Sequence, residues 1–167
     1  INENVKQMLK EFYPQYADKM TYLDNYVNEQ EIIKKSTEYS VDKKDSEYVL
    51  CTCGRLVQVK GFDLAVYAAK ILKDRGIPFV WYFVGDGVER NVLEELIQRN
   101  DLQENIIITG MKDNPYPYMA ASDIYVQPSY EESYGLAILE AMILCKPVVT
   151  TSTMGGKLLV QKNVNGL

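Results

Sequence analysis

Short apolar runs alternate with longer amphipathic segments along most of the chain from Tyr48 onward. The apolar runs predict strands over Tyr48–Cys53, Phe79–Val84, Ile106–Thr109, Ile124–Val126 and Pro147–Thr150. The amphipathic segments predict helices over Phe62–Arg75, Val88–Asn100, Pro115–Ala121 and Tyr134–Cys145. Every residue of Phe79–Val84 is apolar, which is typical of a strand buried on both faces of a parallel sheet. The alternation of strands and helices predicts a doubly wound parallel α/β sheet.

The first 47 residues do not follow this alternation. They are polar, rich in tyrosine and weakly periodic, and the stretch from Ser36 to Glu47 contains few apolar residues. We expect one domain, with a polar leader and linker over residues 1–47 and an α/β core over residues 48–167. Because the chain starts at Ile1 and stops at Leu167 just after a strand-like segment, we interpret it as a piece of a longer protein.

Composition narrows the possible chemistry. The 167 residues include no histidine, so the chain itself holds no Ser-His-Asp or Cys-His nucleophile, no imidazole base and no zinc site with histidine ligands. The net charge is −5 and the lysines alternate with carboxylates, which disfavours nucleic acid as a partner. The spacing of Cys51, Cys53 and Cys145 fits neither a disulfide framework nor a zinc knuckle. We expect buried free thiols in the reducing cytoplasm.

Residues suited to binding a ligand follow several predicted strands. In a doubly wound sheet, ligands bind in the crevice beyond the carboxyl ends of the strands. The glycine, cationic, hydroxyl and acidic residues at this predicted edge are Gly54-Arg55, Lys60-Gly61, Gly85-Asp86-Gly87, Gly110, Ser129, Glu131 and Glu132. The sequence therefore predicts a binding site there.

Glu140 is the one charged residue in the apolar stretch Leu136–Leu144, which we expect to be a helix buried on all sides. An ionised carboxylate in such a helix is costly unless it is paired or hydrogen-bonded. Glu140 therefore forms a buried ion pair, caps a loop or accepts hydrogen bonds from ligand hydroxyls. Glu132 lies eight residues earlier, and Gly135 lies in the first helical turn, where backbone amides attract anions.

The stretch Pro128-Ser-Tyr-Glu-Glu-Ser-Tyr-Gly-Leu-Ala-Ile-Leu-Glu-Ala-Met resembles the P-S-x-x-E-x-[FY]-G-L-x-x-L-E-A-M signature of glycosyltransferase family 4, the retaining GT-B enzymes. Further segments are similar to other motifs of this family, in the same order: Asp24-Asn25-Tyr26-Val27, Gly54-Arg55-Leu56 with Lys60-Gly61, Val84-Gly85-Asp86-Gly87, Ser122-Asp123-Ile124 through Ser129, and Asn165-Gly166. One departure concerns the phosphate loop, because Lys157, Leu158 and Leu159 follow Gly155-Gly156 where the family often has a glutamate.

The resemblance implies a Rossmann-like, C-terminal donor-binding half of a GT-B enzyme. Such an enzyme transfers a hexose-type sugar from a nucleotide diphosphate sugar, such as a UDP-sugar or GDP-sugar, to a glycan or glycolipid with retention. The acceptor would bind to an N-terminal domain that is absent here together with the final C-terminal helices, so the isolated chain would be inactive. For the full-length enzyme, peripheral contact with the inner face of the membrane is a further expectation.

The resemblance also implies roles for individual residues. Arg55 and Lys60 would hold the donor diphosphate, Glu132 would lie near the sugar hydroxyls, and Glu140 would bind the ribose. The other expected binding residues are Gly54, Gly85, Gly87, Met111, Lys112, Ser133, Tyr134, Gly135 and Leu136. Neither a metal ion nor a further cofactor is expected.

Two other hypotheses stay open at this point. One is a non-catalytic module that binds nucleotide sugars without turnover. The other is a Rossmann-type NAD-dependent oxidoreductase, because Gly85 and Gly87 follow a predicted strand as in a dinucleotide fingerprint. However, Arg90 occupies the place of the third glycine of that fingerprint, which counts against this hypothesis.

Overall fold

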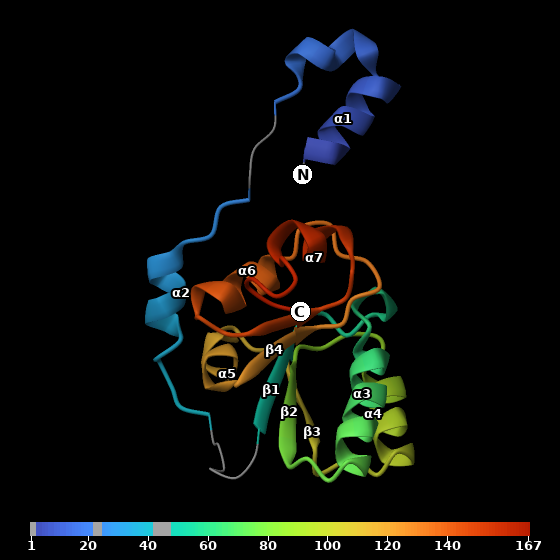
Figure 1. The fold of residues 1–167 in the computed structure, drawn as a ribbon, viewed down its shortest axis with the longest axis vertical. Coiled ribbons are helices and arrows are strands. Elements are labelled where there is room, and N and C mark those ends of the chain that lie inside the picture. The colour runs from blue at the N-terminus through green and yellow to red at the C-terminus, as the bar shows by residue number, and fades with distance from the viewer. Residues whose placement is uncertain (1–2, 22–24, 42–47) are drawn as a thin grey trace.

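A computed structural model of the chain describes residues 3–21, 25–41 and 48–167. Its centre is a parallel sheet of five strands with helices on both faces (Figure 1). The strands are β1 (Tyr48–Cys53), β2 (Phe79–Val84), β3 (Ile106–Gly110), β4 (Ile124–Gln127) and β5 (Val148–Thr150). The doubly wound α/β class predicted from the sequence is confirmed. Residues 42–47 of the expected linker, and Asp24 of the Asp24–Val27 motif, lie outside the described residues.

The strand order β3-β2-β1-β4-β5 places β1 at the centre of the sheet. From β1 the chain proceeds outward to β2 and β3 on one side, and it then returns to build β4 and β5 on the other. The loops that leave β1 and β4 therefore diverge at the carboxyl edge of the sheet. This is the topological switch point at which ligands bind to doubly wound folds.

Apolar side chains of β2 alternate between two cores, one on each face of the sheet. On one face Phe79, Trp81 and Phe83 pack with α3 (Phe62–Asp74) and α4 (Arg90–Arg99). On the other face Val80, Tyr82 and Val84 pack with α5 (Tyr116–Ala121) and α6 (Leu136–Ile143). The fully apolar strand predicted from the sequence is buried along its whole length for this reason.

Helices also occur before residue 48. These are α1 (Glu3–Phe12), the 3-10 helix η1 (Pro14–Lys19) and α2 (Glu29–Lys35). Asn28 caps α2 by accepting a hydrogen bond from the Glu31 amide, and α2 packs against α5 and α6 with Ile32 buried. The folded core thus includes α2, which lies within the segment expected to be a polar leader and linker. In contrast, α1 and η1 lie apart from the sheet (Figure 1).

Some expectations about burial are wrong. Cys51 and Cys53 are buried in β1, but Cys145 is exposed because the chain turns there with a positive φ after α6. The helix at Leu136–Leu144 is not buried on all sides: only one of its faces meets the sheet, through Ile138 and Ala141, and Leu136 is 43% exposed. The other positions of this helix are partly buried, and α6 also packs against α2 and the last helix of the chain.

The last helix, α7 (Met154–Leu159), follows β5 and lies beside α6. Thr153 caps it by accepting a hydrogen bond from the Gly156 amide. Beyond it, Gly166 and Leu167 return to β5, where the Leu167 amide donates to the Val148 carbonyl. None of the described helices is long and apolar enough to cross a membrane.

Candidate functional site

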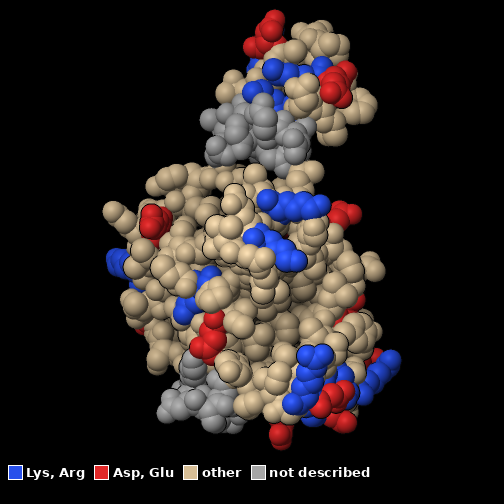
Figure 2. All heavy atoms as spheres, viewed as in Figure 1, with Lys and Arg blue, Asp and Glu red and all other residues tan. Residues whose placement is uncertain are grey.

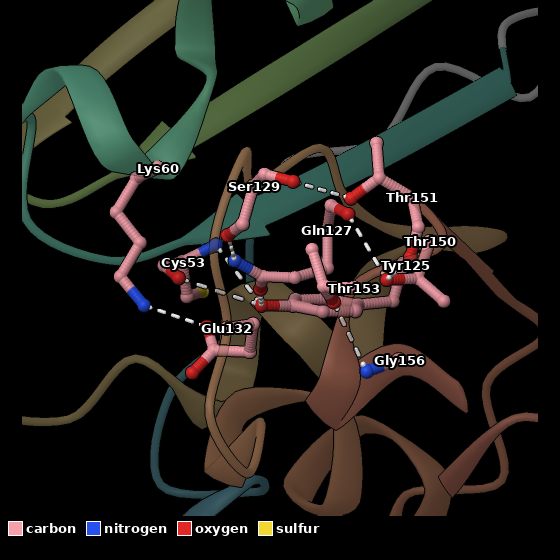
Figure 3. Close-up of polar contacts among 10 residues, drawn as sticks. All are labelled: Cys53, Lys60, Tyr125, Gln127, Ser129, Glu132, Thr150, Thr151, Thr153 and Gly156. Carbon is pink, nitrogen blue, oxygen red and sulfur yellow. Dashed lines mark hydrogen bonds and ion pairs between the residues drawn. The ribbon is translucent and has the colours of Figure 1, made fainter. Parts of the chain in front are cut away.

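Lys60 and Glu132 meet at the switch point. Lys60 ends the 3-10 helix η2 (Gln58–Lys60), which follows β1, and Glu132 lies in the loop between β4 and α6. The Lys60 Nζ lies 2.6 Å from the Glu132 Oε2, and both side chains are largely shielded from solvent, with 23% and 15% exposed (Figure 3). The sequence placed both residues at this edge, and the structure brings them into an ion pair.

Backbone contacts hold the two loops together. The Tyr130 amide donates to the Val59 carbonyl at 2.9 Å, and the Tyr130 hydroxyl donates to Asp63 at the start of α3. On its other side, the loop is fixed to α7, because the Gly155 amide donates to the Glu132 carbonyl at 2.7 Å. The positions of Lys60 and Glu132 are thus set by the main chain as well as by their own ion pair.

Gly85 and Gly87 allow the loop after β2 to approach the loop after β1. A Cβ on Gly85 would lie 1.9 Å from the Gly54 carbonyl oxygen, and one on Gly87 would lie 2.4 Å from the Leu56 carbonyl oxygen. Asp86 between them accepts a hydrogen bond from the Gly87 amide and pairs with Arg90. Both positions therefore require glycine, because the backbone after β2 packs directly against the Gly54–Leu56 loop that follows β1.

The N-terminus of α6 faces the same edge. Gly135 is the N-cap residue with φ of +87°, a conformation that favours glycine, and no side chain caps the first turn. Its amides therefore lack the side-chain acceptor that usually satisfies them, and the positive end of the helix dipole is open to an anion. Ser133 and Tyr134 precede it, and Leu136 begins the helix with a partly exposed side chain.

Glu140 lies one turn further along α6. Its Oε1 accepts a hydrogen bond from the Tyr116 hydroxyl at 3.3 Å, and the structure gives it no ion pair within the described residues. Burial raises the pKa of the Glu140 carboxyl, and the Tyr116 hydrogen bond partly opposes this rise. Burial and the nearby carboxylate raise the pKa of Tyr116 to about 12. Of the three hypotheses for Glu140, the buried ion pair is therefore not observed.

The remaining expected binding residues are spread along the edge. Arg55 is exposed and has no ion pair in the described part of the chain. Met111 is 75% exposed after β3, and the neighbouring Lys112 places its Nζ 6.0 Å from the centre of the Tyr118 ring. All three follow strands at the carboxyl edge of the sheet, and within the described residues none of them forms a hydrogen bond or an ion pair with Lys60 or Glu132.

The sequence analysis did not identify a column of buried polar side chains that lies under the site and consists of Tyr125, Gln127 and Ser129 (Figure 3). The Tyr125 hydroxyl donates to the Gln127 Oε1 at 2.7 Å, and the Gln127 Nε2 donates to the Ser129 Oγ at 2.8 Å. Gln127 is 2% exposed, and Thr151 donates to the Ser129 carbonyl. The column ties β4 to the start of the Glu132 loop. Its signal in the sequence is polar residues at every second position of a strand next to apolar ones.

Charge does not single out a binding face. Lys, Arg, Asp and Glu side chains are scattered over the face seen in Figure 2, and most of that surface is uncharged. Several of the charges neutralise each other within a helix, as Arg90 does with Glu94 and Arg99 with Glu95. Among the described residues, no group of three or more His, Cys, Asp or Glu side chains is placed to hold a metal ion.

The fold is that of a doubly wound α/β protein, and its candidate binding site lies at the switch point of the sheet. The family profile of glycosyl transferases group 1 matches residues 33–167, and the chain belongs to this family. The lipopolysaccharide core biosynthesis glycosyltransferase LpsE of Rhizobium meliloti is 33% identical over 119 residues, which cover 71% of this chain and 34% of LpsE.

Solved GT-B glycosyltransferases share the fold. A glycosyltransferase from Rickettsia africae ESF-5 matches with a TM-score of 0.76 and 26% identity, over 98% of this chain and 46% of its own. Anabaena HepE, solved in complex with UDP and glucose, matches with a TM-score of 0.66 and 28% identity, over 73% of this chain and 34% of its own. The chain therefore spans about a third of LpsE and HepE and less than half of the Rickettsia protein.

Proposed function

We propose that this chain is the C-terminal, donor-binding half of a retaining family 4 glycosyltransferase. The observation that carries the proposal is the convergence of three features at one sheet edge: the Lys60–Glu132 pair, the uncapped N-terminus of α6, and the Glu140 carboxylate. A nucleotide diphosphate sugar has matching groups in the same order, namely sugar hydroxyls, a diphosphate and ribose hydroxyls. That HepE is solved with UDP and glucose supports this donor class.

Each group has a part in the proposed reaction. The bond between the anomeric carbon and the phosphate oxygen breaks while a bond to the acceptor oxygen forms on the same face, and the departing phosphate takes the acceptor proton. The leaving nucleotide diphosphate gains negative charge, which Lys60, Arg55 and the α6 amides stabilise. Glu132 accepts hydrogen bonds from the sugar, and Glu140 accepts them from the ribose. The chain needs no imidazole for these steps.

The proposal extends to the whole protein. The acceptor is a glycan or glycolipid held by residues outside this chain, the transferred sugar is a hexose, and no metal ion takes part. Peripheral contact with the inner face of the membrane belongs to the same proposal. LpsE is named for lipopolysaccharide core biosynthesis, which supports an acceptor of this kind.

Calorimetric titration of the 167-residue chain with UDP, GDP, ADP and NAD tests donor binding. We expect one of the nucleoside diphosphates to bind and the corresponding sugar nucleotide to bind more tightly. NAD binding without binding of any of the three diphosphates would overturn the proposal. Donor hydrolysis or transfer by a longer protein containing this chain then distinguishes an enzyme from a non-catalytic binding module.

A further inference from the structure

Tyr116 lies where a side chain would control the orientation of Glu140. It is the first residue of α5, on a different crossover from Glu140, and the two are 24 positions apart in the chain. The ring is half-buried, and the hydroxyl reaches the Glu140 Oε1 at 3.3 Å. Within the described residues, no other hydrogen bond to the Glu140 side chain is present. Every buried side-chain nitrogen or oxygen of the described residues has a partner, so the unpaired Oε2 is reached by solvent.

The backbone of Tyr116 is itself fixed. Its amide donates to the Asn114 Oδ1 at 3.2 Å, and the Asn114 Nδ2 donates to the Lys35 carbonyl and to the Glu38 carboxylate, each at 2.8 Å. The Tyr39 hydroxyl donates to the Asn114 carbonyl. The end of α2 and the segment after it therefore hold Asn114, and Asn114 holds the start of α5.

Only one of the two oxygens of the Glu140 carboxylate therefore has a hydrogen-bond partner among the described residues. One carboxylate oxygen is anchored by a neutral hydroxyl, and the other has no partner among the described residues and is reached by solvent. A carboxylate anchored through one oxygen presents the other in a defined direction, which a freely rotating one does not. We infer that Tyr116 is a positioning residue that holds the Glu140 carboxylate toward the ribose hydroxyls of the bound nucleotide. The inference rests on the proposed function.

The titratable groups around Glu140 keep a constant charge near neutral pH, so a change of charge there comes from Glu140 itself. Burial raises the pKa of Cys53 in β1 and of Tyr125 in β4, so both are neutral at ordinary pH. Tyr116 in α5 is neutral as well, and its pKa is about 12. Glu31 in α2 has its pKa lowered by Lys35 and stays ionised. The Tyr116 hydrogen bond lowers the pKa of Glu140, so its removal shifts protonation of Glu140 to higher pH.

The test compares Tyr116→Phe with the wild-type 167-residue chain, using UDP as the probe, or GDP or ADP if that is the diphosphate that binds. Tyr118→Phe is the matched control, because Tyr118 lies on the same helix and contacts Tyr82 through its ring. We expect Tyr116→Phe to weaken binding roughly fivefold at pH 7, less than the loss of a direct charged hydrogen bond to the ligand, because Tyr116 acts only through the orientation of Glu140. The loss should grow as the pH falls toward 5, and Tyr118→Phe should bind like the wild type.

Two further measurements separate positioning from packing. Binding of inorganic pyrophosphate, which has no ribose, should be unchanged by Tyr116→Phe. In a Glu140→Ala background, which has no acceptor for the Tyr116 hydroxyl, Tyr116→Phe should have little additional effect on nucleotide binding. An equal loss for pyrophosphate, or additive effects of the two substitutions, would overturn the positioning role.

The inference and the proposed function fail in different ways. If the wild-type chain binds none of the three diphosphates, the proposed function fails first. If the wild type binds and Glu140→Gln weakens binding while Tyr116→Phe matches the wild type at every pH, only the role of Tyr116 fails. Thermal unfolding of each variant shows that the compared proteins are folded.

Discussion

Gly61 lies directly against the backbone of Pro128. A Cβ on Gly61 would be 2.1 Å from the Pro128 carbonyl oxygen, and its φ of +66° is in the left-handed region. The contact joins the loops that carry Lys60 and Glu132, one from each side of the switch point. The spacing of this ion pair therefore depends on the absence of a side chain at position 61.

Gly61→Ala should lower both stability and nucleotide binding. The alanine must adopt a strained φ and also displace the Pro128 carbonyl, so we expect a loss of about 2 to 4 kcal/mol in the free energy of unfolding. Gly76→Ala is the control, because Gly76 has φ of +68° but nothing within 4 Å of a Cβ, and it should cost about 1 kcal/mol. Urea unfolding of the two variants measures the difference. Equal losses would show that the Pro128 contact is unimportant.

Arg55→Ala and Lys60→Ala should each weaken binding of the nucleoside diphosphate by about 1.5 to 3 kcal/mol, the usual value of a hydrogen bond to a charged group. The loss should shrink at high salt for the exposed Arg55 more than for the shielded Lys60. Lys70→Ala serves as the control, since Lys70 pairs with Asp74 on the outer surface of α3. Calorimetry at two salt concentrations gives both quantities, and wild-type affinity in either variant would contradict its assigned role.

Glu132→Gln should have opposite effects on two ligands. The substitution removes the partner of Lys60, so the lysine interacts more strongly with the diphosphate and UDP should bind more tightly, by about 1 kcal/mol at most. The sugar nucleotide loses the carboxylate that accepts its hydroxyls, so its advantage over UDP should disappear. Parallel titrations with the two ligands measure this. A sugar nucleotide that keeps its full advantage would remove Glu132 from the sugar site.

Gln127→Leu should destabilise the fold by about 2 to 3 kcal/mol. Leucine has a similar size but removes both hydrogen bonds of Gln127, so the buried Ser129 hydroxyl loses its partner and the Tyr125 hydroxyl keeps only its longer contacts with the Cys53 backbone. The exposed Gln98 on α4 provides the control, because Gln98→Leu removes no buried hydrogen bond. Chemical unfolding should show a large loss for the first variant and a small one for the second. Similar stabilities would mean that the polar column contributes little.

Glu140→Gln should stabilise the chain while it weakens nucleotide binding. Since burial raises the pKa of Glu140 in the folded state, its ionised form opposes folding at neutral pH. This penalty is absent below the unfolded-state pKa and grows as the pH rises through the folded-state pKa. The variant should therefore gain stability over the wild type at pH 7, and the gain should fade toward pH 4. A gain that does not depend on pH would show that the charge of Glu140 is not responsible.

Regular features of the fold and the centre of the site could be predicted from the sequence. Tyr48–Cys53 and Phe79–Val84 are strands with the predicted bounds, because continuous apolar runs in a parallel sheet have few alternatives. The order of strands and helices placed Lys60 and Glu132 at one edge. Their direct pairing depends on a backbone contact between two loops, which spacing along the chain does not encode.

Contacts between distant segments could not be predicted from the sequence. The Tyr116–Glu140 hydrogen bond and the support of Asn114 by Lys35 join segments 24 and 79 positions apart, and no local pattern specifies such a pairing. The prediction that the apolar helix over Leu136–Leu144 is buried on all sides was wrong for a related reason. Its hydrophobicity predicts burial, but its first turn lies at the sheet edge, where Leu136 is only partly covered by the described chain.

The hydrogen bonds that fix the Glu132 loop have a consequence for the kinetics of binding. The loop is attached to Val59 on one side and to Gly155 on the other by main-chain hydrogen bonds within the chain itself. The conformational entropy of ordering it is therefore lost during folding rather than during association. A ligand at this edge meets a loop that is already ordered, so its association should be limited by diffusion and charge rather than by the rate at which the loop finds its shape.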